Sequence, residues 1–309
     1  MKVKKIKKGS AVGIITPAAA IDKNSSRFKL LEERLNNLGL KVKYGKAVGK
    51  RYGYLGGTDE DRIEDLEAMF LDSEVSVIIA MLGGYGSSRI VDKVNYEIIK
   101  NNPKLLIGFS DITVFINAIY QKTNLPTIHG PVGIYLGKAE FDSISQADFE
   151  ALLFTSQQGR ILKNPKDNAK TLVSGKAKGK LVGGNLSLIA TLIGTPYEVD
   201  FTDKIIFIED VDEAPYAIDR YFSSLRLSGS LKKAKGFVFG YFSNIKQTEN
   251  SFTIDEIINE YFIDLNVPII TNFSSGHDLP FISLPIGLEV ELDSDRKTIK
   301  ILEELYEAD

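Results

Sequence analysis

The stretch Leu105-Leu-Ile-Gly-Phe-Ser-Asp-Ile-Thr113 says most about the fold class of this chain. It opens with a short apolar run typical of a buried strand, and the apolar residues from Ile112 to Ile119 then recur at helical spacing. Residues 75–81 form another apolar run without polar alternation, as expected of a strand whose sheet is covered on both faces. Strands that alternate with helices predict right-handed βαβ units and a parallel sheet.

The same alternation extends toward the N-terminus. Strands are predicted at 11–15 and 40–44, and the apolar spacing predicts a helix over 28–38 between them. A second helix is predicted to begin at Thr58, because Thr58 and Asp61 have the spacing of a capping box. Residues 1–154 are therefore interpreted as an N-terminal α/β domain.

The second half of the chain has a different character. Residues 155–170 are polar and lack periodicity, and they are interpreted as a linker to a smaller, β-rich α/β domain over 171–309. Helices are predicted near Leu186, Ile218 and Ile257. Strands are predicted at 204–208, 236–239, 268–271, 288–292 and 298–302.

Composition excludes several functional classes. The 309 residues carry a net charge of −3, which gives no basic footprint for nucleic acid. No stretch approaches the ~20 apolar residues of a membrane span, and the apolar run after the N-terminal lysines is too short for a signal peptide. The absence of cysteine fits a reducing compartment, so a cytoplasmic location is expected. With no cysteine and two histidines, we expect no metal and no cofactor.

Ser110 lies where the predicted strand turns into the helix. This position exposes a side chain at the carboxyl end of a parallel strand, where α/β active sites gather. The helix N-terminus also offers free N–H groups to a developing oxyanion. The pattern resembles a nucleophile elbow, although no glycine stands two residues later. Taken alone, the segment favours the simpler interpretation that Ser110 or Asp111 caps the helix.

A glycine-rich turn follows the strand at 75–81. Gly84 and Gly86 match part of a dinucleotide fingerprint, but Arg89 replaces its third glycine. Glycines let backbone amides approach any ligand closely, so an oxyanion or substrate loop is an equally good interpretation. A short helix is predicted around Ile90.

Two histidines are available as general bases. His277 lies in a loop after a predicted strand, a typical place for a catalytic residue, whereas His129 is interpreted as structural. A histidine base needs a carboxylate partner. Glu209 ends the apolar run 205–208, and the acidic residues after it fit a solvated loop.

Taken together, these segments resemble the LD-carboxypeptidase family, which includes the microcin-immunity peptidases. The resemblance covers almost the whole chain, and the order of its motifs is specific. The motifs are Gly9–Pro17, Gly83–Gly86, Pro103–Thr113, His129–Pro131, Gly183–Leu186, Gly194–Pro196, Glu209–Asp210, Pro215–Tyr216, Ile218–Arg220 and Gly276–His277.

The resemblance implies a Ser–His–Glu triad of Ser110, His277 and Glu209, with the backbone amides of Gly84 and Asp111 as oxyanion donors. It also implies an N-terminal Rossmann-like domain similar to class I amidotransferases, an active site between the two domains, and a homodimer. The expected activity is release of terminal D-alanine from murein tetrapeptide during peptidoglycan recycling.

Three further residues are candidates for substrate binding. Arg89 could hold the terminal carboxylate with its guanidinium fork, or form a surface salt bridge instead. Asn185 and His129 are weaker candidates. Two other functions stay open: cleavage of a microcin C-type peptidyl-nucleotide antibiotic, and a non-catalytic nucleotide- or ligand-binding module. The chain has no tryptophan, an aromatic residue typical of the microcin-immunity relatives, which favours the recycling branch.

Overall fold

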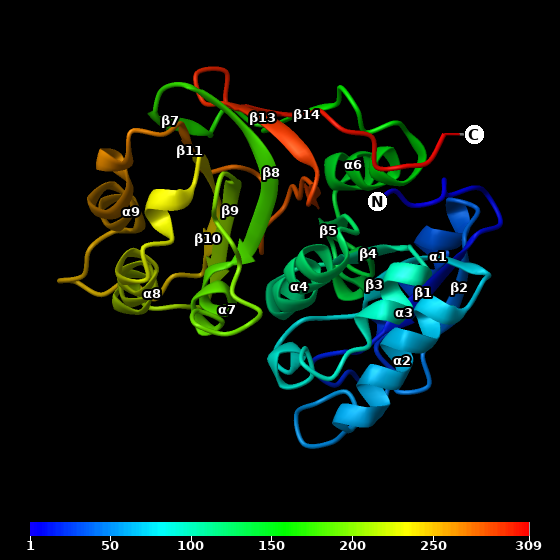
Figure 1. Cartoon of the computed structure of the whole chain (residues 1–309). Coiled ribbons are helices and arrows are strands. Elements are labelled where there is room, and N and C mark those ends of the chain that lie inside the picture. The colour runs from blue at the N-terminus through cyan, green and yellow to red at the C-terminus, as the bar shows by residue number, and fades with distance from the viewer. Residues whose placement is uncertain (309) are drawn as a thin grey trace.

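The computed structural model describes residues 1–308, which form two β-sheets side by side with helices packed around them (Figure 1). The first sheet has the strand order β12-β5-β4-β3-β1-β2. Strands β1 to β5 pair in parallel, as the alternating pattern predicts, and β12 joins β5 in antiparallel fashion. The strands of this sheet are β1 (Ala11–Ile15), β2 (Lys41–Tyr44), β3 (Val75–Ala80), β4 (Leu105–Gly108), β5 (Thr127–His129) and β12 (Leu284–Ile286).

Six α-helices accompany the first sheet: α1 (Ser26–Asn37), α2 (Asp59–Leu71), α3 (Tyr96–Asn101), α4 (Thr113–Thr123), α5 (Gly133–Leu136) and α6 (Ser143–Phe154). The capping box predicted for Thr58 and Asp61 is confirmed, since each side chain accepts from the other's backbone amide. The helix predicted around Ile90 is instead a single 3₁₀ turn, η1 (Ser87–Arg89). A second such turn, η2 (Ser110–Ile112), precedes α4.

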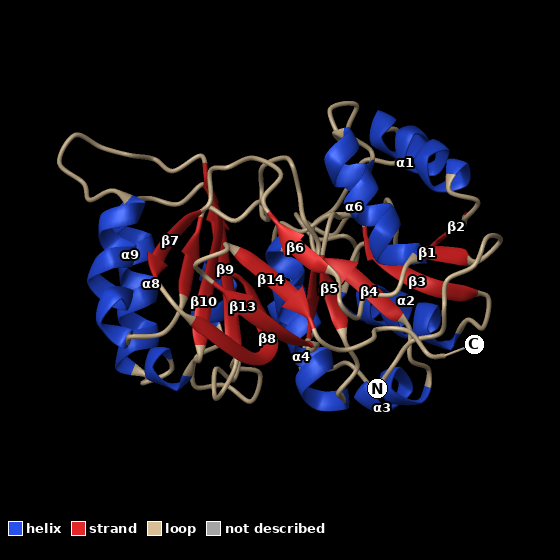
Figure 2. Cartoon of the chain, turned by 90° about the horizontal axis from the view of Figure 1, so that it is seen from above, coloured by secondary structure: helices blue, strands red, loops and turns tan. Residues whose placement is uncertain are grey.

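The second sheet has the order β6-β14-β13-β8-β9-β10-β11-β7, in which β8 to β11 are parallel and the other pairs are antiparallel. Helices α7 (Leu186–Thr191), α8 (Pro215–Leu227) and α9 (Ile254–Phe262) pack beside it, and Figure 2 shows α8 and α9 at its outer end. Its strands are β6 (Ile161–Lys163), β7 (Lys170–Val173), β8 (Lys176–Asn185), β9 (Ile205–Val211), β10 (Gly236–Ser243), β11 (Ile269–Thr271), β13 (Glu289–Asp293) and β14 (Thr298–Ile301).

The predicted division of the chain needs two revisions. The linker at 155–170 contains β6, whose apolar Leu162 is buried where β6 pairs with β14. The segment 171–309 also sends β12 back into the first sheet. Both features depend on partner strands far away in the sequence, so local composition does not reveal them.

The two halves of the chain share one hydrophobic core. Its buried residues include Phe109 from the first half and Phe207, Phe273 and Phe281 from the second. A smaller cluster lies between the second sheet and its helices. Within residues 1–308, no helix combines the length and apolar character that crossing a membrane requires.

Candidate active site

Ser110 lies on a strained turn at the carboxyl end of β4. Its φ of +62° is in the left-handed region, which side-chain-bearing residues adopt rarely. Phe109 is the N-cap residue of η2 and Ile112 is the N-cap residue of α4. Neither element has a hydrogen bond from a capping side chain. The hydroxyl of Ser110 therefore caps neither element, so the capping interpretation of this residue was wrong. Strain of this kind holds a side chain outward in a nucleophile elbow.

His277 and Glu209 come together from different parts of the second half. Glu209 is fully buried on β9, and its Oε2 lies 2.7 Å from Nδ1 of His277, which follows β11. A proton on Nδ1 that faces this carboxylate leaves Nε2 as the free base. Burial acts to lower the pKa of His277, but the charge and hydrogen bond of Glu209 outweigh it, so the pKa is raised above its ordinary value.

Gly276 makes the close contact of His277 with Glu209 possible. Its φ is +126°, and a Cβ at this position would lie 2.9 Å from Oε2 of Glu209. Position 276 therefore requires glycine for two reasons: the backbone has a positive φ, and a side chain there would collide with Glu209.

Ser110 and His277 face one cleft of about 630 Å³ between the two sheets. The cleft has a mainly apolar wall from the first half and a polar wall from the second. The other residues that line it are Leu82, Gly83, Gly84, Phe109, Val132, Ile134, Tyr135, Val211, Asp212, Ser243, Asn244 and Asp278.

The glycine-rich turn lies against the serine. A Cβ built on Gly83 would be 3.0 Å from Oγ of Ser110 and 3.2 Å from the amide nitrogen of Asp111. Across residues 1–308, the amides of Gly84 and Asp111 donate to no protein acceptor. Two free amides near a serine hydroxyl can stabilise an oxyanion formed there.

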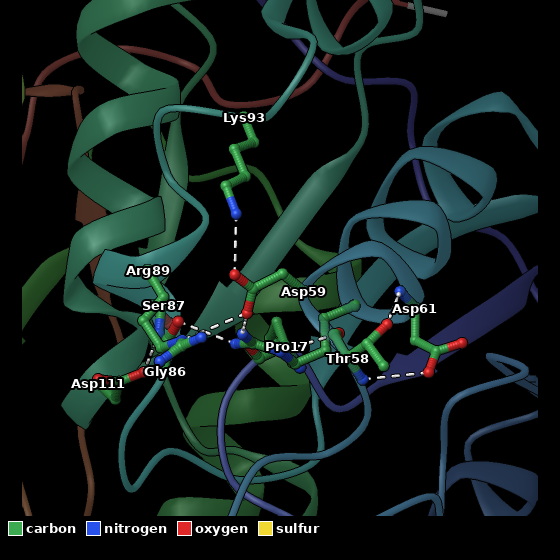
Figure 3. Close-up of polar contacts among 10 residues, drawn as sticks. Pro17, Thr58, Asp59, Asp61, Gly86, Ser87, Arg89, Lys93 and Asp111 are labelled. Carbon is green, nitrogen blue, oxygen red and sulfur yellow. Dashed lines mark hydrogen bonds and ion pairs between the residues drawn. The ribbon is translucent and has the colours of Figure 1, made fainter. Parts of the chain in front are cut away.

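The side chain of Asp111 points away from the cleft. It is buried, and its Oδ2 accepts a hydrogen bond of 2.8 Å from the amide of Ser87, which ties the serine turn to the glycine-rich turn (Figure 3). Burial raises the pKa of this carboxyl group, while the contacts with Ser87 act in the opposite direction.

Two aromatic residues support His277, and no pattern in the sequence points to one of them. The ring of Phe109 lies 4.7 Å from the imidazole, measured between ring centroids. The hydroxyl of Tyr135 on α5 donates to the carbonyl oxygen of His277 at 2.8 Å. Tyr135 is distant in sequence and belongs to no motif, so only the tertiary structure identifies it.

His129 is not exposed to the cleft. It is fully buried, and neither ring nitrogen has a hydrogen-bond partner among the described residues. Its ring packs between Phe207, at 4.7 Å, and Phe281, at 5.6 Å. Burial, followed by the charge of His277, lowers its pKa to about 3, so the imidazole is neutral. This position matches the structural interpretation of His129 and gives it no path to substrate.

Arg89 and Asn185 also lie outside the described lining of the cleft. Arg89 forms an ion pair with Asp59, with 3.3 Å between Nε and Oδ1, and 41% of its side chain is exposed. Its position thus favours the salt-bridge alternative. Asn185 is buried at the N-cap of α7, where its side chain accepts from the amide of Leu188.

Asn185 links the two halves of the site. Its backbone amide donates to Oγ1 of Thr113 on α4, and its Nδ2 donates to Oδ1 of Asp210, both at 2.9 Å. Asp210 follows Glu209 on β9, and burial, followed by the charge of Glu209, raises its pKa to about 7. The bridge therefore joins the helix after Ser110 to the strand that carries Glu209.

No group of three or more potential metal-ligating side chains occurs among the residues that the structure describes. A serine on a strained strand-to-helix turn, opposite a histidine–glutamate pair, is an arrangement typical of hydrolases.

The chain belongs to the LD-carboxypeptidase family. Residues 12–130 match the family's N-terminal domain and residues 178–292 match its C-terminal domain. The probable murein peptide carboxypeptidase of Bacillus subtilis is 38% identical over 304 residues, covering 97% of this chain and 94% of that protein. The murein tetrapeptide carboxypeptidase of Pseudomonas aeruginosa is 30% identical, covering 92% and 94%.

Solved structures agree with this assignment. The Microcin C7 self-immunity protein MccF of Escherichia coli, solved in complex with aspartyl sulfamoyl adenosine, superposes with a TM-score of 0.93. The superposition covers 99% of this chain and 100% of that chain at 25% identity. The two-sheet α/β fold expected from the sequence is confirmed, and the chain is a peptidase of this family.

Proposed function

We propose that the chain is a serine-type LD-carboxypeptidase that releases terminal D-alanine from murein tetrapeptide. One observation carries the proposal: the His277–Glu209 pair, 2.7 Å apart, opens onto the same cleft as Ser110. The relatives named for murein peptides support the choice of substrate.

In this proposal, Nε2 of His277 accepts the proton of Ser110 as Oγ attacks the carbonyl carbon before the terminal D-residue. Glu209 stays ionised and stabilises the imidazolium ion. The amides of Gly84 and Asp111 bind the oxyanion of the tetrahedral intermediate. His277 then gives its proton to the leaving amine, and the bond to D-alanine breaks.

Water completes the reaction. His277 removes a proton from a water molecule, which attacks the ester carbonyl of the acyl-enzyme. Collapse of the second intermediate returns the proton to Oγ of Ser110 and releases the shortened peptide. No step requires a metal or a cofactor.

The test is mass spectrometry of L-Ala-γ-D-Glu-meso-diaminopimelate-D-Ala after incubation with wild type and with Ser110→Ala. We expect D-alanine from the wild type alone. Alanine keeps the Cβ of serine, so the variant should fold, and its circular dichroism spectrum checks this. Release by both proteins would reject Ser110 as the nucleophile, and release by neither would reject the recycling function.

The likeness to MccF motivates a second assay for cleavage of a peptidyl nucleotide. Aspartyl sulfamoyl adenosine is incubated with the wild type under the same conditions. Cleavage of this compound, with no release of D-alanine from the tetrapeptide, would assign the chain to the antibiotic-cleaving branch. Failure of a fluorophosphonate to label Ser110, with stabilisation by a dinucleotide, would instead support a ligand-binding module.

We also propose that the protein acts as a homodimer in the cytoplasm. The lack of cysteine fits a reducing compartment, and the family resemblance implies the dimer. Light scattering coupled to size-exclusion chromatography tests the oligomeric state, and a monomer at micromolar concentration would reject the proposed homodimer.

A further inference from the structure

Arg62 on α2 is a buried cation close to the glycine-rich turn. Its side chain is 0% exposed, and an arginine is rarely buried unless its donors are satisfied. Nη1 donates to the carbonyl oxygen of Pro17 at 2.7 Å and to that of Gly86 at 2.8 Å. Nη2 donates to Oδ1 of Asp59 at 2.5 Å. Two of these partners are therefore backbone carbonyls of loops beside the candidate site.

The contact with Gly86 involves one particular peptide group. The carbonyl of Gly86 and the amide of Ser87 belong to the same peptide, and that amide donates to Oδ2 of Asp111 at 2.8 Å. The peptide is thus held at both ends, by a buried guanidinium on one side and a buried carboxyl group on the other. Figure 3 shows Gly86, Ser87 and Asp111 together at one end of this network.

This peptide lies beside both proposed oxyanion donors. Gly86 ends the turn that carries the free amide of Gly84, and Asp111 carries the other free amide next to Ser110. Gly86 has a φ of +142°, and a Cβ there would lie 2.7 Å from Nη1 of Arg62. The glycine therefore allows the guanidinium to approach the turn this closely.

The contacts of this guanidinium lie among three neighbouring loops. Strands β4, β3 and β1 are adjacent in the first sheet. Pro17 follows β1, Gly86 follows β3, and Asp111 follows β4. Ala19, two residues after Pro17, also donates to the carbonyl of Gly83 at 3.2 Å. Arg62 thus bonds directly to the loops after β1 and β3, and the Gly86–Ser87 peptide links them to the loop after β4. All three loops lie at the carboxyl ends of parallel strands, where the candidate site lies.

We propose that Arg62 is a positioning residue that sets the geometry of the oxyanion hole by holding the Gly86–Ser87 peptide against Asp111. Arg62 touches no substrate and acts through the turn that bears Gly84 and through the residue after Ser110. The inference rests on the proposed function, because it assigns these amides to an oxyanion.

The test replaces Arg62 with lysine and follows two reactions. An ammonium group lacks the planar fork that reaches two carbonyls and Asp59 at once, so the turn should shift. We expect the rate of Ser110 labelling by a fluorophosphonate and the kcat for D-alanine release to fall roughly 10- to 100-fold. KM should stay within about twofold, because the cleft walls that bind the peptide are unchanged.

Lys93→Met is the matched control. Lys93 binds the other oxygen of the same Asp59, with 2.8 Å between Nζ and Oδ2, but contacts neither Gly86 nor Pro17. We expect wild-type labelling and turnover from this variant. A folded Arg62→Lys protein with an unchanged labelling rate would overturn the proposal, as would an equal loss in Lys93→Met.

If Arg62→Lys does not fold, Asp111→Asn tests the proposal from the other side of the Gly86–Ser87 peptide. It keeps the side-chain shape but replaces the carboxyl group that accepts from the Ser87 amide with a carboxamide, so we expect labelling about fivefold slower. An unchanged rate would overturn the proposal. The same two assays on the wild type distinguish a failure of the proposed function from a failure of the role proposed for Arg62. Labelling of Ser110 without D-alanine release would reject the substrate while leaving the role of Arg62 testable, and no labelling would reject the proposed nucleophile itself.

Discussion

The hydroxyl of Tyr135 donates to the carbonyl oxygen of His277 at 2.8 Å, which ties a residue of the first half of the chain to the loop that carries the candidate base. Tyr135 also lines the cleft and packs its ring against Phe109, with 5.0 Å between centroids. The loop of His277 is therefore held from both halves of the molecule.

Tyr135→Phe should lower kcat about three- to tenfold with little change in fold, because one net hydrogen bond contributes about 1 kcal/mol. Steady-state kinetics of D-alanine release would measure this. Tyr120→Phe is the control, since Tyr120 lies outside the cleft lining and should lose nothing in turnover. Equal kinetics in both variants would show that the hydroxyl of Tyr135 does not position His277.

The pH dependence of kcat/KM should report the raised pKa of His277. Protonated imidazole cannot accept the serine proton, so activity should rise with pH through an apparent pKa above the ordinary value of about 6.5. Glu209→Gln removes the largest influence that raises this pKa, so the rise should move to lower pH. The maximal rate should also fall by roughly 10³- to 10⁴-fold, as for the carboxylate of other triads.

Asp212→Asn is the comparison for that profile. Asp212 also raises the pKa of His277, but its charge acts less strongly than that of Glu209 and it forms no hydrogen bond with the imidazole. Its loss should therefore shift the profile less than Glu209→Gln. Identical profiles for the wild type and Glu209→Gln would contradict the pairing of Glu209 with the catalytic imidazole.

His129 should make the protein sensitive to acid. Its folded pKa of about 3 is below the unfolded value, so its stabilising contribution is present above about pH 6.5 and is lost as the pH falls toward 3. Between pH 7 and pH 5 the loss amounts to about 2 kcal/mol. His129→Leu should remove this part of the pH dependence, which urea unfolding at the two pH values would measure. An equal loss of stability in both proteins would show that His129 is not the group responsible.

Asn185→Ala should destabilise the protein by about 2–3 kcal/mol, because it removes a helix cap and a buried donor to Asp210. It should also lower kcat about tenfold, since the bridge between Thr113 and Asp210 aligns α4 with β9. Urea unfolding and turnover would test both effects. Asn95→Ala is the control: Asn95 caps α3 on the surface, so stability should fall by about 1 kcal/mol with no change in kcat. A normal kcat in Asn185→Ala would limit the bridge to a structural role.

Local sequence determined much of the fold. The apolar runs that became β1, β3 and β4 and the capping box at Thr58 depend on neighbours a few residues apart, so their pattern is visible in the sequence itself. The order of the family motifs likewise indicated Ser110, Glu209 and His277, which the structure brings to one region.

Only the tertiary structure decided features that depend on distant partners. The pairing of β12 with β5, the burial of Arg62 beneath Gly86 and the contact of Tyr135 with His277 each join segments that share no local pattern. Side-chain roles also changed with their surroundings: Arg89 pairs with Asp59, and His129 is enclosed by phenylalanines. A sequence specifies which groups are present, but their pKa values and partners follow from burial and distance, which exist only once the chain has folded.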